Sequence, residues 1–127
     1  FQIRDDDPAV VARLEAALHS MAEEVNAQGR CSVTIECIRT GTPAIMVAAF
    51  QQAIEDAGKS FAGGKSLRMP SGAGHDAQVL ATIMPAGMLF VPSIGGISHH
   101  WRENTADEDI VIGAQVFVDA CRRLLVT

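Results

Sequence analysis

Residues 71–77 read SGAGHDA, and this glycine-rich stretch has two competing interpretations. The glycines and the final alanine fit the G-x-G-x-x-A spacing of a dinucleotide-binding turn. The adjacent His75 and Asp76 fit acid–base or substrate-contact chemistry instead. The two interpretations predict different kinds of protein, and the flanking sequence separates them.

The dinucleotide interpretation fails on the sequence around the turn. That fingerprint needs a buried strand directly before the first glycine, and an acidic residue at the end of a second strand ~20 residues on. Here Pro70 lies just before the turn, residues 67–69 form a poor core strand, and residues 92–98 contain no acid. The stretch GGKS at 63–66 also fails as a phosphate-binding loop, because Lys59 stands where its first glycine is required.

The hydrophobic pattern of the first third predicts a strand, a helix and a second strand. Residues 1–5 and 31–38 alternate apolar and polar side chains, as half-buried strands do. A helix between them is expected to begin at the N-cap Asp7, followed by proline, and to end at Gly29. Its apolar stripe consists of Val11, Leu14, Leu18, Met21 and Val25. We therefore expect a β-α-β unit over residues 1–39.

After a linker-like break at residues 39–43, the pattern predicts helix–strand–helix–strand–loop–helix. The expected elements are a helix at 47–57, a helix that SGAGHDA opens and that runs to about Met84, and short strands at 66–69 and 88–91. The last helix is expected to open with a capping box between Thr105 and Glu108, and its apolar run 110–126 is expected to be well buried. Both histidine motifs then fall in loops after strands, where α/β folds place their sites.

Composition excludes several partners. The 127-residue chain has a formal net charge of −5 and no basic run, which argues against nucleic acid or an anionic membrane surface. No apolar run reaches the ~18–20 residues needed to span a bilayer. The cysteines are odd in number and form no C-x-x-C pair, so we expect buried, reduced thiols in a cytoplasmic protein. They are Cys31, Cys37 and Cys121.

Two parts of the chain are candidates for binding a ligand. The SGAGHDA glycines allow close approach to the backbone, and His75 could donate a hydrogen bond to a carboxylate or a developing oxyanion. Asp76 could orient that ring; alternatively, both side chains only cap the following helix. Arg4 ends the first expected strand, and it is either a solvated arginine among acids or a bidentate clamp for a carboxylate.

The loop GGISHHWRE at 95–103 is the candidate for metal binding. A neutral imidazole from His99 or His100 is a suitable ligand, and Glu103 could support the ligand or cap the last helix. Alternatively, both are exposed loop histidines. A catalytic zinc needs about three protein ligands, and this chain has no other closely spaced set. It can supply one ligand to a site that other residues complete.

Residues 71–104, followed by an acidic cap and a long helix, closely resemble the hydantoinase/carbamoylase amidases of the zinc aminoacylase/carboxypeptidase superfamily. Members include N-carbamoyl-L-amino acid hydrolases, β-ureidopropionases and allantoate amidohydrolases. The resemblance covers nearly the whole chain and implies an α/β (α+β) fold. Residues 1–41 resemble the second half of a β-α-β dimerisation domain, and residues 42–127 resemble the C-terminal part of a zinc-exopeptidase-like catalytic domain.

The resemblance implies a role for each motif residue. His99 matches the last ligand of a site for two divalent metals, zinc or else manganese, cobalt or nickel. Glu103 matches the acid that follows this ligand and supports it. Gly74 and His75 match substrate contacts, and Arg4 matches the arginine that holds the substrate carboxylate.

This sequence also departs from the family. The other metal ligands and the general-base glutamate are expected upstream of Phe1, so no catalytic residue is expected here, and the chain is expected to be the C-terminal part of a longer one. His100 stands where relatives usually carry a small residue, so it is not expected to be a ligand. Met46 joins Val47 directly, where relatives carry several more residues.

The implied function is metal-assisted cleavage of the carbamoyl C–N bond of an N-carbamoyl-L-amino acid, with allantoate amidohydrolase or β-ureidopropionase activity as alternatives. The expected partners are a small ureido acid with a carboxylate, a second copy bound through residues 1–39, and the remainder of the same polypeptide. A truncated, non-catalytic product that only dimerises is a competing hypothesis.

Overall fold

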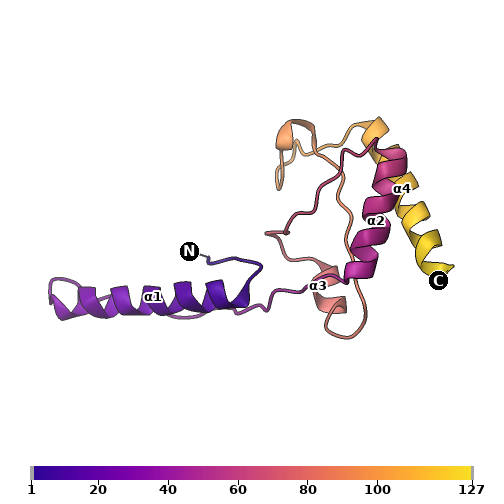
Figure 1. Ribbon diagram of the computed structural model, residues 1–127. Helices are drawn as coiled ribbons and strands as arrows, with labels where there is room; N and C mark the ends of the chain where they lie inside the picture. Colours follow the sequence, from indigo (N-terminus) through magenta and orange to yellow (C-terminus); the bar gives the residue numbers. More distant parts are fainter. Residues whose placement is uncertain (1, 127) are drawn as a thin grey trace. The chain divides into compact units, whose positions relative to one another are not determined.

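A computed structural model describes residues 2–126, and helices are the regular elements of this part of the chain (Figure 1). They are α1 (Pro8–Ala27), α2 (Ala48–Phe61), α3 (Asp76–Leu80), the short 3-10 helix η1 (Ile94–Gly96) and α4 (Asp107–Leu125). The chain divides into two compact units. One unit comprises the residues up to Ile45 together with Pro70–Gly74, and the other comprises Met46–Met69 and the chain from His75 onward.

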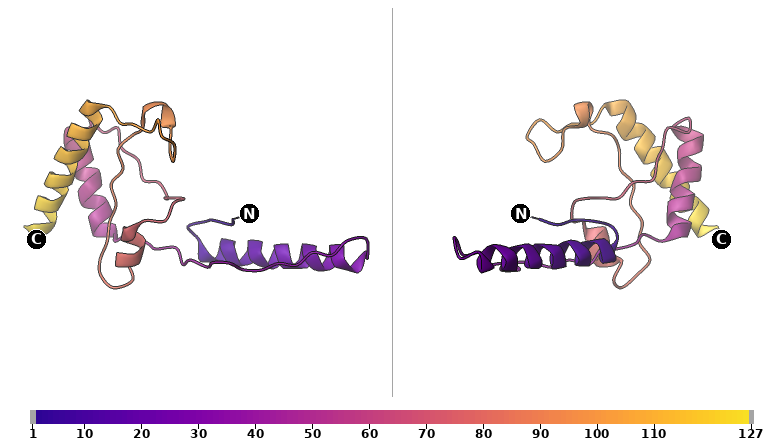
Figure 2. Two further views of the ribbon diagram at one scale, coloured as in Figure 1. Left: turned by 180° about the vertical axis from the view of Figure 1, so that it is seen from behind. Right: turned by 60° about the vertical axis from the view of Figure 1, so that its left-hand side comes forward.

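The first unit is built on α1, whose limits confirm the prediction. The Asp7 carboxylate accepts a hydrogen bond from the Ala9 N–H at 2.8 Å, and the chain turns at Gly29 with a left-handed φ of 68°. The returning segment lies alongside the helix in Figures 1 and 2. It is held there by Asn26, whose side-chain amide donates to the Val33 carbonyl at 2.9 Å and accepts from the Val33 N–H at 2.7 Å.

The second unit is organised by α2 and α4, which run antiparallel beside each other (Figures 1 and 2). Small side chains at the contact let the two helix backbones approach closely. The buried core consists of Ala53, Ala57, Val116 and Ala120, flanked by Ile54, Leu89, Ile112 and Leu124. Helix α2 continues to Phe61, four residues beyond its predicted end, because Gly58 is buried inside it rather than ending it.

The predicted strands do not form in the described part of the chain. No segment of residues 2–126 makes a strand, including 31–38, 66–69 and 88–91; Phe1 lies outside the described residues. The reason is that a strand is completed by backbone hydrogen bonds to a neighbouring strand. Alternation of apolar and polar residues predicts two faces but does not supply that neighbour. The α/β class is therefore not confirmed by this structure.

The predictions for α3 and α4 need correction. Helix α3 ends at Leu80 and continues only as turns. The expected capping box of α4 is absent, because Ala106 is the N-cap and no side chain caps the helix. Burial of α4 is limited to Gly113, Val116 and Ala120. Val116 and Ala120 belong to the core shared with α2, and Gly113 lies against the Val91 side chain. Large apolar side chains on its other faces are exposed: Ile110, Val111, Phe117, Val118 and Leu125.

The prediction that the cysteines are buried is wrong. All three thiols are free, but Cys31 and Cys37 are exposed and Cys121 is half-buried. Cys31 and Cys37 lie on the returning segment of the first unit, where most side chains are exposed. The sequence pattern had placed both among the alternating residues of a covered strand.

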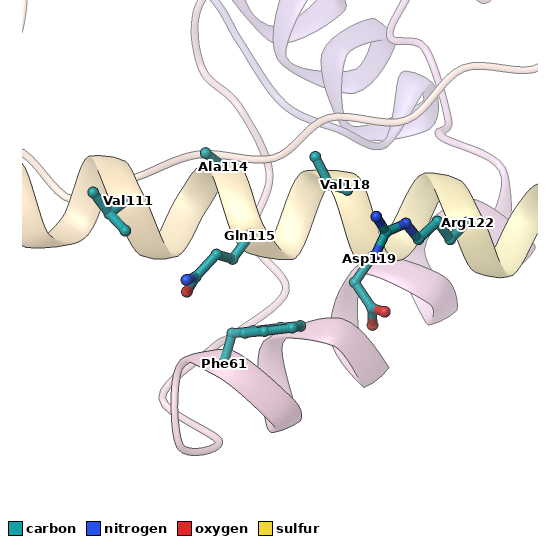
Figure 3. Close-up of a pocket in the computed structure, with 7 residues that line it drawn as sticks. All are labelled: Phe61, Val111, Ala114, Gln115, Val118, Asp119 and Arg122. Carbon is teal, nitrogen blue, oxygen red and sulfur yellow. The ribbon is translucent and has the colours of Figure 1, made fainter.

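An open groove of about 410 Å³ lies where Phe61, at the end of α2, faces one side of α4 (Figure 3). The α4 residues that line it are Val111, Ala114, Gln115, Val118, Asp119 and Arg122. Figure 3 shows the Gln115 and Asp119 side chains directed toward the Phe61 ring. None of the sequence-predicted site residues lines this groove, so it is a separate feature of the second unit.

Gly87 packs so closely against α2 that the position does not accommodate a larger side chain. A Cβ at Gly87 would lie 2.9 Å from the Phe50 Cβ, which is fixed by the α2 backbone and cannot rotate away. We expect Gly87→Ala to destabilise the protein by ~1–3 kcal/mol, as overpacking does. Gly72→Ala is the control, since nothing lies within 4 Å of its Cβ position. Thermal unfolding of both variants checks this, and an unchanged melting temperature for Gly87→Ala would contradict the packing.

Arg68 ties the segment after α2 back onto that helix. Its Nη2 and Nε donate to Glu55 Oε2 at 2.7 and 3.0 Å, Nη1 donates to Gln51 Oε1 at 3.1 Å, and Nη2 also donates to Gln52 Oε1 at 3.0 Å. The hydrogen bonds from Arg68 to the Glu55 carboxylate lower the pKa of Glu55, with a further contribution from the charge of Lys59. A partner for Arg68 thirteen residues away could not be read from the sequence pattern.

Arg68→Ala is expected to raise the pKa of Glu55 toward its ordinary value. Because the folded pKa lies below the unfolded one, the network stabilises the fold fully above the ordinary glutamate pKa of ~4.3 and loses this effect as pH falls through the folded value. Carbon-13 NMR titration of the Glu55 carboxyl measures the change, with Arg30→Ala as the control. An identical Glu55 titration in Arg68→Ala would show that the network is not formed in solution.

Candidate functional site

His99 lies in a loop that is closed by a backbone hydrogen bond. The Ile94 N–H donates to the Asn104 carbonyl at 2.8 Å, which brings the two ends of the loop together. The chain enters the loop through η1, where Gly95 and Gly96 have left-handed φ values of 68° and 67°. Glycine adopts this backbone at no steric cost, so the glycine pair allows the sharp turn before the histidines.

The backbone of His99 is itself left-handed, with a φ of 54°, and no other non-glycine residue among those described has a positive φ. Its N–H donates to Glu103 Oε2 at 2.7 Å. Neither ring nitrogen has a hydrogen-bond partner within residues 2–126. The exposed imidazole therefore has a free lone pair, as a metal ligand requires.

The neighbouring His100 is in a different state. Its Nδ1 accepts a hydrogen bond from the Arg102 N–H at 3.1 Å, and its ring lies 5.5 Å from that of Trp101. A neutral imidazole that accepts at Nδ1 carries its proton on Nε2, so it has no free lone pair for a metal. Local hydrogen bonding thus distinguishes two adjacent histidines of identical chemistry.

The SGAGHDA turn crosses the boundary between the two units, with Gly74 in the first and His75 in the second. His75 is the N-cap residue of α3 but makes no side-chain cap, and its exposed ring meets Phe90 edge-on at 5.4 Å. Asp76 begins α3, and within the described residues its carboxylate neither caps the helix nor bonds His75. The contact with Phe90 was missed from the sequence, where the run 88–91 was interpreted only as a buried strand.

Arg4 and the first part of the SGAGHDA turn, up to Gly74, lie within the first unit. Arg4 Nη1 donates to the Gly72 carbonyl, and Nη2 donates to Gln2 Oε1 at 2.5 Å. The arginine is exposed, so its guanidinium is oriented by the turn and open to solvent. The structure therefore joins two of the sequence-predicted elements, 68 residues apart, by one hydrogen bond.

The described residues do not bring together a full set of metal ligands. Within residues 2–126 there is no group of three or more His, Cys, Asp or Glu side chains that could hold a metal ion. His99 fits a metal as one ligand, because its ring is exposed and unbonded while its backbone is held by Glu103. None of the described helices is long and apolar enough to cross a membrane.

Comparison with known proteins gives a consistent picture. Residues 4–123 match the sequence profile of the family described as Peptidase family M20/M25/M40. The chain is 41% identical over 80 residues, 63% of its length, to an allantoate amidohydrolase of Bacillus subtilis. It is 34% identical over 116 residues, 91% of its length, to an N-carbamoyl-L-amino acid amidohydrolase of Geobacillus stearothermophilus.

A solved structure is also similar: the crystal structure of an amidase of the hydantoinase/carbamoylase family from Burkholderia phymatum. It matches 95% of this chain with a TM-score of 0.81 and 40% sequence identity. The chain spans only part of these proteins. It covers 18% of the Bacillus enzyme and 28% of each of the other two.

Proposed function

Because the chain belongs to peptidase family M20/M25/M40, we propose that it forms part of a metal-dependent amidohydrolase that cleaves the carbamoyl C–N bond of N-carbamoyl-L-amino acids. The single observation that carries this proposal is the loop at 93–104, which offers one unbonded histidine, His99, on a backbone held by Glu103. The carbamoyl-amino-acid relative aligns with nearly the whole chain. Allantoate amidohydrolase activity is the second candidate, because the relative with that name is more identical over a shorter stretch.

His99 is the residue of this chain that would hold a metal, within a two-metal site of zinc, or of manganese, cobalt or nickel. Enzymes of this family are generally metal-dependent. When bound, a divalent metal supplies Lewis-acid chemistry at the reacting carbonyl. The remaining ligands and the general base would come from residues outside this chain.

The substrate contacts would come from Arg4 and the SGAGHDA turn. Arg4 would bind the substrate carboxylate through its guanidinium fork, which fixes the position of the reacting carbon. The Gly74 N–H and the His75 ring would hold the substrate and the charge that develops on its carbonyl oxygen. Support comes from the hydrogen bond between Arg4 and the Gly72 carbonyl, which connects the arginine to this turn.

The proposed domain organisation assigns residues 1–41 to a partial dimerisation domain and residues 42–127 to the catalytic domain. The segments that alternate but form no strand here would pair with strands outside this chain. A homodimer through residues 1–39 is supported by exposed apolar side chains in that region, with Met21 64% and Ile38 94% exposed. A cytoplasmic location is part of the proposal, because an odd number of cysteines without a C-x-x-C pair is typical of reduced thiols.

A substrate panel tests the proposal. The full-length protein that contains this chain would be assayed with N-carbamoyl-L-amino acids, allantoate and N-carbamoyl-β-alanine. We expect the highest kcat/KM with an N-carbamoyl-L-amino acid. A preference for allantoate or for N-carbamoyl-β-alanine would replace that substrate with one of the alternatives. Hydrolysis of none of them, by a protein that still dimerises, would favour the non-catalytic hypothesis.

A further inference from the structure

We propose that Glu103 is a positioning residue: it holds the His99 backbone in its left-handed conformation and so sets the direction in which the imidazole leaves the loop. This inference rests on the proposed role of His99 as a metal ligand. In this role Glu103 binds the His99 main chain and contacts neither the metal nor the substrate.

The hydrogen bonds of the loop support this positioning role of Glu103. The Glu103 carboxylate accepts from the His99 N–H at 2.7 Å, and within residues 2–126 this is the one hydrogen bond of its side chain. The Glu103 N–H in turn donates to the His100 carbonyl at 2.9 Å, so the residue is anchored by its own backbone. The two bonds together form a closed turn around His99.

The backbone conformation explains why such a bond is needed. A residue with a Cβ is disfavoured in the left-handed region, because the Cβ approaches the following carbonyl oxygen. His99 adopts a φ of 54° without the freedom that glycine has. Hydrogen bonds to ionised acceptors are roughly twice as strong as neutral ones. The Glu103 carboxylate is therefore suited to offset the cost, and without it the His99 backbone would return to a common region and carry its ring elsewhere.

The contact differs from the usual support of a metal-binding histidine. Such a histidine generally donates its second ring nitrogen to a carboxylate, which changes the basicity of the ring. Here the carboxylate binds the main chain and leaves the ring unbonded. Loss of Glu103 should thus change the geometry of metal binding while leaving the imidazole itself unaltered.

The test compares Glu103→Ala, Glu103→Met and Glu103→Gln in the full-length protein loaded with cobalt(II). Alanine and methionine remove the acceptor, and methionine retains the length of the side chain, so it serves if the alanine variant does not fold. We expect both to weaken cobalt affinity by about 10–100-fold and to alter the visible cobalt spectrum. Glutamine retains an acceptor oxygen but not the charge, so it should restore both in part. Glu24→Ala, on exposed α1, is the matched control.

Unchanged affinity and spectrum in the alanine or methionine variant would overturn the proposal, and so would a glutamine variant as weak as the methionine one. His99→Ala separates this failure from failure of the proposed function. Wild-type cobalt binding by His99→Ala would remove the ligand assignment itself. Loss of cobalt in His99→Ala with full binding in the Glu103 variants would remove only the positioning role.

Discussion

His99→Ala in the full-length protein is expected to lose bound metal and, with it, hydrolysis. Removing a residue that only hydrogen-bonds to a metal ligand lowers metal affinity by about 10–100-fold. Removing the ligand itself should therefore lower metal affinity by at least ~100-fold. His99 is the described histidine whose structure combines an unbonded ring with a fixed backbone in the GGISHHWRE loop. Elemental analysis after dialysis against metal-free buffer measures the loss.

His100→Ala is the matched control for this experiment, because it removes the same side chain one residue further along. The His100 Nδ1 already accepts from the Arg102 N–H, so we expect this variant to retain its metal. Metal content at the wild-type level in His99→Ala would contradict the ligand assignment. Loss of metal in both variants would show that the loop as a whole, and not the His99 ring, is required.

Arg4→Ala is expected to raise KM for carboxylate substrates. A hydrogen bond to a charged partner contributes ~1.5–3 kcal/mol, which corresponds to roughly a 10–150-fold increase in KM. The structure ties Arg4 to the Gly72 carbonyl of the SGAGHDA turn and leaves its guanidinium exposed to solvent. Steady-state kinetics with an N-carbamoyl-L-amino acid and with its carboxamide analogue would measure the effect.

Two controls accompany the Arg4 experiment. Arg4→Lys keeps the charge but loses the two-pronged geometry of the guanidinium, so it should restore binding only in part. Arg13→Ala, on the exposed surface of α1, should leave KM unchanged. An unchanged KM for Arg4→Ala, or an equal increase for the carboxamide substrate, would mean that Arg4 does not bind the carboxylate.

The limits of α1 could be predicted from the sequence because they depend on neighbouring residues. The Asp7 carboxylate caps α1 by accepting a hydrogen bond from the N–H two residues further along, and Pro8 suits the first helical position. Gly29 adopts the left-handed conformation in which the chain turns. All of this chemistry lies within a few residues. The same kind of reasoning failed at Thr105, where a plausible capping box competes with Ala106 as the N-cap and is not formed.

The strands could not be predicted in the same way. Alternation over residues 31–38 says which side chains prefer a covered face, but a strand also needs hydrogen bonds from a second strand. In this chain the Val33 backbone finds its partner in the side-chain amide of Asn26 instead. The burial of α4 was overestimated for a related reason, since an apolar sequence does not reveal how many of its faces have neighbours.

Candidate site residues could be identified from sequence motifs, but their backbone conformations and hydrogen-bond partners could not. The loop GGISHHWRE indicates two histidines and an acid, and nothing in those letters tells His99 from His100. The distinction comes from backbone geometry: a left-handed φ at one and an accepting Nδ1 at the other. The edge-on contact of His75 with Phe90 likewise depends on packing between segments fifteen residues apart.

The release of ammonia from an N-carbamoyl-L-amino acid tests the central claim most directly. The full-length protein would be stripped with a chelator and assayed before and after a divalent metal is restored, beside the 127-residue chain alone. We predict hydrolysis by the metal-restored full-length protein, little by the stripped protein, and none by the 127-residue chain even with added metal. Hydrolysis by the chain alone, or no metal-dependent hydrolysis by the full-length protein, would contradict the account.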